Sequence, residues 1–430
     1  QLSSLVIDPS MESRLQGIQG LRALAAGSIL LLHIVYFSSP PGGGFELGWF
    51  GTYLVPHLPL GLTLLFLLSA FLLYRPFAAA VMRETRVPSL RRYLLKRALR
   101  ILPAYWFILL FTGLVLRTTN VLEPDGTRSV GALDDPVLLV LNLAFVQNFF
   151  PSTLLTGIGP AWALADVFVF YLVLPLLVLM AFGLAKRAST RERRRLAVLV
   201  PAAVLLLLGL SGKAVAAFVV PGGAWEQSWH AVIERSFWAH ADFFALGMAV
   251  AVLRVDSEDG VLRLPTWWRK AAVAALVLVA VPTAVLTTAE GNADGSTSNY
   301  AYDSLMAIAC ALFLTLVVLP AQDRPTVLVR LLETRLLVVG GIVSYSVFLW
   351  QLPLIRWLSV HDFTFAETTG FVANVAVIGL LTLALSVFTY RCFEFPALRR
   401  KATIGRRSSD ERPPVIESAS PAVEVVETRA

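Results

Sequence analysis

Ten stretches of this sequence are long and apolar enough to cross a lipid bilayer, and this feature limits the fold more than any other. Each is close to the roughly 20 residues that a helix needs to cross about 30 Å of hydrocarbon. Lipid offers the backbone no hydrogen-bond partners, so each stretch must be helical. The sequence therefore predicts an all-α polytopic integral membrane protein with about ten transmembrane helices. We place these spans at 18–37, 57–74, 101–117, 162–184, 196–219, 236–254, 271–289, 301–320, 336–358 and 370–390.

The composition supports a membrane protein and argues against a nucleic-acid partner. Hydrophobic residues make up 57% of the chain and charged residues 15%, whereas soluble domains carry about 25% charged residues. The formal charge of +7 comes from Lys and Arg in short loops between apolar runs, which is typical of membrane orientation. The two cysteines, Cys310 and Cys392, form neither a metal-ligand spacing nor a disulfide framework, so we expect no metal.

The distribution of positive charge predicts the orientation. The apolar segment 137–150 is short and bounded by Pro136 and Pro151, so we expect it not to cross. With both termini in the cytoplasm, the inner segments then hold 30 of the 36 Lys and Arg residues. We predict a cytoplasmic N-terminal segment at 1–17, a transmembrane domain at 18–390, and a cytoplasmic tail at 391–430 that is first basic and then disordered.

Two ionisable residues share one face of the first span. Arg22 and His33 are separated by three helical turns to within about 20°, which places them about 16 Å apart along the axis. Ionisable side chains within a span cost about 2.5–3.5 kcal/mol each on insertion scales, so each needs a reason. From these residues alone, a functional pair and a snorkelling arginine with an internally bonded histidine are equally good interpretations.

A second polar group is predicted near the outer ends of later spans. Asp166 lies in the fourth span, His240 and Asp242 in the sixth, and Asp303 in the eighth. A histidine beside a carboxylate in apolar surroundings is suited to act as a general base, because the carboxylate fixes the tautomer and stabilises the imidazolium.

The inner loop after the second span carries a basic helix face. Arg97 and Arg100 are three residues apart and so project from the same side of a helix. Two guanidinium groups on one face suit phosphate recognition. Binding to anionic lipid headgroups is the alternative, and the two residues alone favour it.

Five blocks in order give the chain a recognisable pattern. They are GIQGLRALAAGSILLLH (17–33), LTLLFLLSAFLLYRP (62–76), RALRILPAYW (97–106), SYSVFLWQLPL (344–354) and FEFPALRR (393–400). In these blocks and over residues 16 to 400 the chain resembles the membrane-bound acyltransferase family 3, whose bacterial members O-acylate sugars and other cell-surface or secreted molecules. The resemblance implies acyl transfer from cytoplasmic acyl-CoA to a hydroxyl presented toward the outer face.

The resemblance also implies roles for individual residues. The arginines Arg97 and Arg100 would hold the CoA phosphates, with Tyr105 in the same donor block. Arg22 would line the entry of the thioester arm, and His33 would deprotonate the acceptor or carry the acyl group. Further candidates are a catalytic carboxylate and four substrate-positioning residues: Asp166, Trp162, Tyr345, Gln351 and Glu394.

The chain departs from the family pattern at three positions. Val167 stands where the fourth-span block usually has Glu, so Asp166 is offset from that position by one residue, or 100° around a helix. Gln351 replaces the usual histidine of the ninth span and cannot act as a base, although it can still donate and accept hydrogen bonds. Phe395 replaces an arginine in the closing block. These changes affect the acceptor side more than the donor side.

The sequence therefore predicts an acyltransferase of the bacterial plasma membrane. Its expected partners are acyl-CoA, membrane lipids and a hydroxyl-bearing glycan, lipid or secreted small molecule. The alternative is a proton-coupled transporter or flippase without acyl chemistry, in which the intramembrane Asp and His residues would form a proton relay.

Overall fold

The chain folds into a bundle of long helices. The computed structural model describes residues 15–38, 45–123, 126–222, 227–289, 298–319, 325–365 and 368–397. Within these ranges ten helices are long and apolar enough to span a membrane, which confirms an all-α, multi-pass fold. They are α1 (Ile18–Phe37), α3 (Leu60–Met82), α4 (Leu90–Leu110), α6 (Ala161–Ala185), α7 (Arg191–Phe218), α9 (Phe237–Glu258), α10 (Trp268–Ala289), α11 (Ser298–Val318), α13 (Arg335–Val360) and α14 (Thr368–Thr389). Most of the predicted N-terminal segment and of the predicted tail lies outside the described residues.

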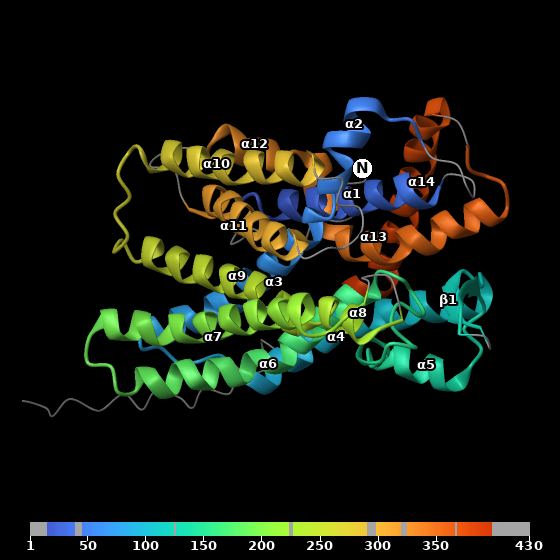
Figure 1. Ribbon diagram of the computed structural model, residues 1–430. Helices are drawn as coiled ribbons and strands as arrows, with labels where there is room; N and C mark the ends of the chain where they lie inside the picture. The colour runs from blue at the N-terminus through green and yellow to red at the C-terminus, as the bar shows by residue number, and fades with distance from the viewer. Residues whose placement is uncertain are drawn as a thin grey trace, which may run out of the picture.

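Short elements lie between the long helices. They are α2 (Gly48–Tyr53), α5 (Pro136–Leu143), α8 (Trp229–Glu234), α12 (Val327–Leu332) and an antiparallel hairpin of β1 (Thr119–Leu122) and β2 (Arg128–Gly131). In Figure 1 the hairpin and α5 lie together at the right, and the loops that join α6 to α7 and α9 to α10 lie at the left. We call these two ends of the bundle the hairpin end and the basic end. The apolar segment 137–150 forms α5 and a 3₁₀ turn, not a span.

The long helices extend beyond their apolar windows. Helix α4 begins at Leu90, well before the predicted residue 101, and Ser89 caps it by accepting a hydrogen bond from the Arg92 backbone N–H. Thr190 caps α7 in the same way through the Arg193 N–H. The difference arises because hydropathy marks the part of a helix at membrane depth, whereas capping residues mark where the helix begins.

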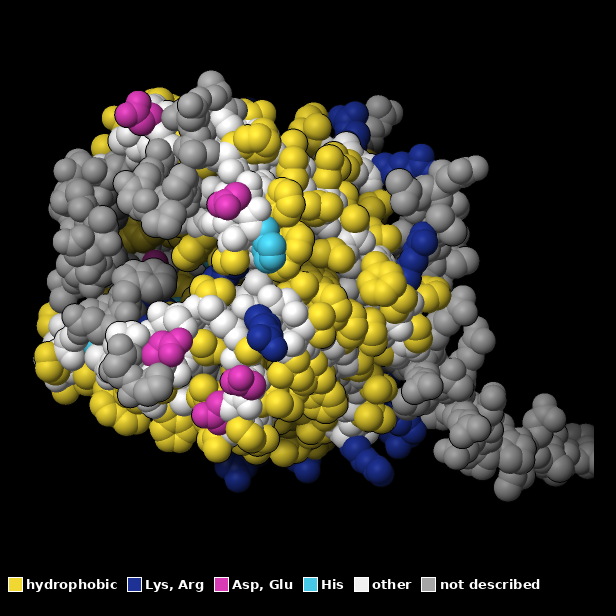
Figure 2. Space-filling view, turned by 90° about the vertical axis from the view of Figure 1, so that its right-hand side faces the viewer, with side chains coloured by type: hydrophobic (Ala, Val, Ile, Leu, Met, Phe, Trp, Pro, Cys, Tyr) yellow, Lys and Arg dark blue, Asp and Glu magenta, His cyan; other side chains and the backbone are white. Residues whose placement is uncertain are grey.

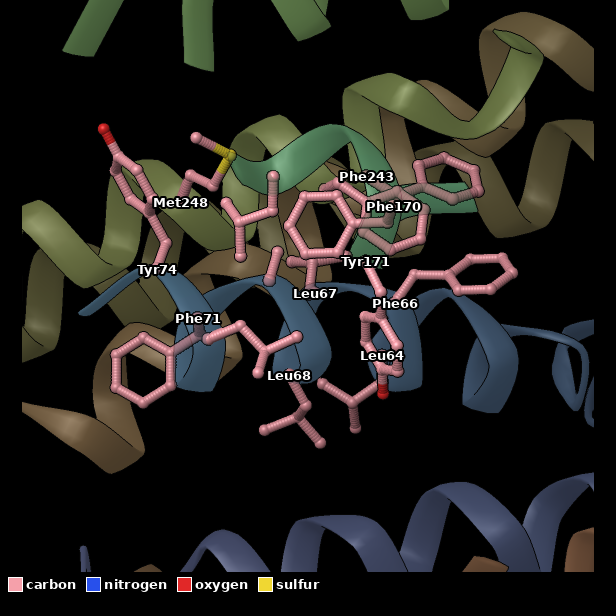
Figure 3. Close-up of a cluster of buried hydrophobic side chains, with 14 of the residues drawn as sticks. Leu64, Phe66, Leu67, Leu68, Phe71, Tyr74, Phe170, Tyr171, Phe243 and Met248 are labelled. Atoms are coloured by element: carbon pink, nitrogen blue, oxygen red, sulfur yellow. The ribbon is translucent and has the colours of Figure 1, made fainter. Parts of the chain in front are cut away.

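Helix α3 forms the centre of the bundle. Its buried side chains pack against α6 and α9, as the close-up in Figure 3 shows. The labelled residues of this cluster are Leu64, Phe66, Leu67, Leu68, Phe71, Tyr74, Phe170, Tyr171, Phe243 and Met248. Many apolar side chains instead face outward, among them Leu207, Phe218 and Leu278, and hydrophobic side chains cover much of the surface in Figure 2. An apolar exterior is what a helix bundle presents to lipid.

Helices α1 and α13 pack closely and start at the same end of the bundle. Gly20 of α1 lies against the backbone of Leu332, just before α13, and Gly341 of α13 lies against the carbonyl of Gln19. A side chain at either glycine would collide with backbone, so both positions require glycine for this approach. The two helices therefore run in parallel from the basic end to the hairpin end, and they carry four of the predicted site residues, Arg22, His33, Tyr345 and Gln351.

Candidate functional site

A cavity of about 290 Å³ lies at the basic end between α3 and the start of α4. Three of its lining residues are cationic, namely Arg92, Lys96 and Arg97. The guanidinium carbon of Arg97 lies 5.9 Å from the Tyr93 ring centroid and 6.0 Å from that of Tyr171, so two aromatic rings hold this side chain in place. The cavity also has an apolar wall, formed by Leu72, Leu73, Pro76, Phe77 and Pro88. We call this cavity the basic groove.

Within the described part of the chain, the cations of the basic groove lack carboxylate partners, unlike several other arginines at the same end of the bundle. Arg83 and Arg191 both bind Asp259, at 2.7 and 2.5 Å. Burial opposes the ionisation of Asp259, but these hydrogen bonds outweigh it and hold its pKa below the usual range. Across the described residues, no ion pair involves Arg92, Lys96 or Arg97. Positive charge in the groove is therefore available to an anionic ligand.

Four predicted residues come together near the start of α1. Glu394, in a π-helical turn that follows α14, is buried and accepts a 2.5 Å hydrogen bond from the Ser346 hydroxyl. Arg22 of α1 and Arg100 of α4 are both near enough to act electrostatically on this carboxylate. The Tyr345 hydroxyl donates to a carbonyl of α4 at 2.9 Å. The structure thus brings Arg22, Arg100, Tyr345 and Glu394 together from four helical segments.

The Tyr–Trp pair of α4 secures the short helix α5. The Tyr105 hydroxyl donates to the Asn142 carbonyl at 2.8 Å, and the Trp106 indole N–H donates to the Leu143 carbonyl at 3.0 Å. These carbonyls lie at the C-terminal end of α5, where a helix leaves its last carbonyls without internal partners. The Tyr105 ring also stacks on Phe145, with centroids 4.3 Å apart. The Tyr105 hydroxyl is therefore committed to α5, and its predicted role at the donor stays a prediction.

His33 lies toward the hairpin end of α1. Its Nδ1 atom is buried and makes no hydrogen bond to any described residue. The Gln351 amide and the Arg356 guanidinium of α13 both lie close enough to act on the ring. Arg356 sits 5.9 Å from the Phe37 ring centroid and forms no ion pair within the described part of the chain. A histidine with an unused nitrogen therefore lies beside an uncompensated positive charge.

Asp166 pairs with His240 and not with His33. Its Oδ2 lies 2.8 Å from His240 Nδ1, and the carboxylate is only 2% exposed. The imidazole packs between the rings of Trp162 and Phe66, at centroid distances of 5.6 and 5.5 Å. The predicted residues Asp166 and Trp162 thus both contact His240. The sequence had placed this histidine at about the same depth in the membrane as Asp166.

The sequence reasoning missed a buried ion pair between α7 and α9. Lys213 Nζ lies 2.6 Å from Asp242 Oδ2 and 2.8 Å from Ser304 Oγ. The Ser304 hydroxyl also donates to Asp242, at 3.1 Å. Gly209 lies directly against Asp242, which lets the two helices approach. A lysine inside the predicted span 196–219 was the available signal, since such a residue needs a partner in the membrane. The sequence reasoning also missed Arg356, although this arginine lies within the predicted span 336–358 and gave the same signal.

Comparison with known proteins agrees with this arrangement. A family model described as an acyltransferase domain matches residues 15–391, which is most of the chain. No curated protein and no solved structure matches it. The match covers all ten long helices, the basic groove and both histidine sites. The chain therefore belongs to the membrane-bound acyltransferase family 3 and is an integral membrane acyltransferase.

Proposed function

We propose that the protein moves an acyl group from cytoplasmic acyl-CoA to a hydroxyl of a sugar, glycolipid or natural product. One observation carries this proposal: a single helix bundle holds a groove with three cations that form no ion pair with the described residues and, nearer its hairpin end, a histidine with an unused nitrogen. By contrast, Arg75, Arg195 and Arg191 at the same end are held by Glu258, Asp256 and Asp259. The plasma membrane of a bacterium is the location that fits this activity.

The donor would bind with its nucleotide at the basic end. The cations Arg92, Lys96 and Arg97 suit the CoA phosphates, and the apolar wall of the groove suits the adenine. From there, Arg22 and Arg100 lead toward the centre of the bundle. Arg22 and His33 are about 16 Å apart along α1, a distance that a long, thin thioester arm can bridge. The thioester carbonyl would then lie beside His33.

Acyl transfer at His33 needs a base and a stabiliser of negative charge. His33 takes the proton from the acceptor hydroxyl, whose oxygen then attacks the thioester carbonyl carbon. Arg356 stabilises the oxyanion that forms, and Gln351 positions the acceptor. The carbon–sulfur bond breaks, and the CoA thiolate takes the proton from His33. The products are the acyl ester and free CoA, and no metal takes part.

The test is thiol release from a panel of CoA thioesters. Purified protein is given acetyl-, propionyl-, succinyl- and octanoyl-CoA, with and without a cell-envelope extract as the source of acceptor. We expect turnover of at least one thioester and a loss of about 10²–10⁴-fold in the His33→Ala variant. Arg356→Gln should lower kcat by about 10²–10³-fold with little change in KM. Arg263→Gln, at an exposed position of the basic end, is the control. A His33→Ala variant with normal turnover would refute the mechanism.

The transporter alternative has one observation in its favour. The pairs His240–Asp166 and Lys213–Asp242 place titratable groups in contact within the membrane, as a proton relay requires. A transporter would release no thiol from any thioester of the panel, but it would move protons in sealed vesicles when its cargo is added. Thiol release that depends on His33 would exclude it.

A further inference from the structure

The hairpin carries an arginine whose inner nitrogens have no partner. Arg128 lies in β2, where it pairs across the hairpin with Leu122. Its Nε and Nη2 atoms are buried, and neither makes a hydrogen bond to a described residue. The side-chain amide of Gln227, just before α8, donates to the carbonyl of Gly126 and so ties the hairpin turn to the bundle. Arg128 therefore lies between the hairpin and the bundle.

Among the described residues, Glu123 is the carboxylate nearest to Arg128 in the sequence, and it does not pair with Arg128. Successive side chains of a strand point to opposite faces, so Arg128 and Ser129 face opposite sides of the hairpin. Ser129 donates a hydrogen bond to Glu123 on its own side. Burial lowers the pKa of Arg128, which reflects the cost of holding a guanidinium away from water. Buried guanidinium nitrogens without partners are expensive, so a site with this feature is incomplete without an anion.

A second guanidinium lies next to Arg128. Arg235, at the C-terminal cap of α8, is 6% exposed and is near enough to Arg128 for the two charges to repel. Its Nη1 atom lies 3.4 Å from Glu234 Oε2. Glu234 is therefore a partner of Arg235, whereas the buried Nε and Nη2 of Arg128 make no hydrogen bond to a described residue. Planar forks of this kind match the oxygens of a carboxylate or phosphate.

The guanidinium pair lies close to the proposed reaction centre. The Arg235 guanidinium carbon is 6.0 Å from the Trp162 ring, which packs on His240. Gly159 lies against Leu352 and the guanidinium of Arg356. Trp162 follows Gly159 by three residues along the chain, so the Cα atoms of the two residues are about 10 Å apart at most. A molecule the size of one or two sugar rings can therefore reach from Arg235 to the surroundings of Arg356.

We propose that Arg128 and Arg235 bind a carboxylate or phosphate group of the acceptor, so that the acceptor of this acyltransferase is anionic. This inference rests on the proposed function for the identity of the ligand as acceptor. The anionic group is held at the hairpin, and a hydroxyl elsewhere on the same molecule is presented toward His33 and Arg356. Trp162 offers an aromatic surface between the two ends. A neutral sugar would leave the Arg128 nitrogens unpaired and would bind weakly.

The test measures binding of anionic and neutral sugars to the purified full-length protein. The probes are D-glucuronate, D-glucose 6-phosphate and D-glucose, followed by calorimetry and by the shift in Tm. We expect the two anionic probes to bind and glucose not to bind. Arg128→Gln should weaken binding of the anionic probes about 10-fold or more, and Arg128→Lys should weaken it less. Arg117→Gln, at an exposed position before the hairpin, should change nothing.

Three results would overturn the assignment. They are equal binding of glucose, unchanged binding in Arg128→Gln at an unchanged Tm, and displacement of glucuronate by vesicles of phosphatidylglycerol but not of phosphatidylcholine. The last result would assign the site to a lipid headgroup. Thiol release by the wild type without acceptor separates this inference from the proposed function, because it reports consumption of the donor alone. If the wild type binds glucuronate but never consumes a thioester, the proposed function fails while the anion site remains.

Discussion

The Oδ2 atom of Asp166 in α6 lies 2.8 Å from Nδ1 of His240 in α9. Asp166 stands one residue before the position where the family pattern usually has Glu, and this contact places its carboxylate against an imidazole. Asp166 fixes the orientation of the imidazole, and the imidazole packs on Trp162. We therefore expect Asp166 to act through His240 rather than on His33, so that the two side chains behave as one unit.

A double-mutant cycle tests that coupling. Asp166→Asn and His240→Gln should each lower thiol release, and the double variant should lose no more than the stronger single variant. The expected interaction energy is about 0.5–3 kcal/mol, the range for residues in contact. Rates are compared at equal amounts of folded protein. Additive losses in the double variant would show that the two residues act independently.

Removing a cation from the basic groove should weaken donor binding. Arg97→Gln deletes a guanidinium held between Tyr93 and Tyr171, which makes no ion pair with the described residues. We expect the Kd for CoA to rise about 10-fold, since a charge-assisted hydrogen bond contributes roughly 1.5–3 kcal/mol. The wild-type affinity should also fall with added salt. Arg263→Gln is the control, and an unchanged Kd in Arg97→Gln would remove the groove from the donor site.

The ion-pair cluster at the basic end should make stability depend on pH. The folded-state pKa of Asp259 is lowered, so its stabilisation is present above the pKa of the unfolded state, about 3.9, and is lost as the pH falls through the folded value. Asp259→Asn should reduce Tm by about 1–3 °C at pH 7, and the difference should shrink below pH 4. Asp362→Asn, at an exposed position of the hairpin end, is the control. A difference that grows toward low pH would contradict the assignment.

The buried pair between α7 and α9 should be costly to break from one side. Lys213→Met leaves the Asp242 carboxylate buried without its cation and should destabilise the fold by about 3–5 kcal/mol. The double variant Lys213→Met with Asp242→Leu should recover most of that loss, because no unpaired charge remains. Unfolding in mixed detergent measures both. Lys270→Met serves as a surface control. An unchanged free energy of unfolding in Lys213→Met would show that the ion pair does not stabilise the fold.

The spans were predictable because their physical cause is local. Each apolar run predicts one helix. The segment that forms α5 was correctly not counted as a span, because it is short and flanked by prolines. The hairpin of β1 and β2 was not predicted, since two strands of four residues carry little pattern. The start of α4 was placed too late, because its first turns are amphipathic and basic rather than apolar.

Which helices are neighbours could not be read from the sequence. Depth along the membrane put Asp166 and His240 at one level, but hydropathy does not say that α6 and α9 touch. The pairing of Lys213 with Asp242 depends on the close approach at Gly209 in the same way. The five sequence blocks indicated which residues matter, whereas the packing of α1 on α13 determined which of them meet.

The most direct test of the account is the sidedness of its two ends. A variant with Cys310→Ala and Cys392→Ala receives either Arg92→Cys, which lines the basic groove, or His361→Cys, which lies just beyond α13. Sealed inside-out and right-side-out vesicles are then treated with a membrane-impermeant maleimide. We expect the Arg92→Cys variant to be labelled only in inside-out vesicles and to be protected from labelling by CoA. We expect the His361→Cys variant to be labelled only in right-side-out vesicles, with no protection by CoA. Labelling of Arg92→Cys from the outer side would contradict it.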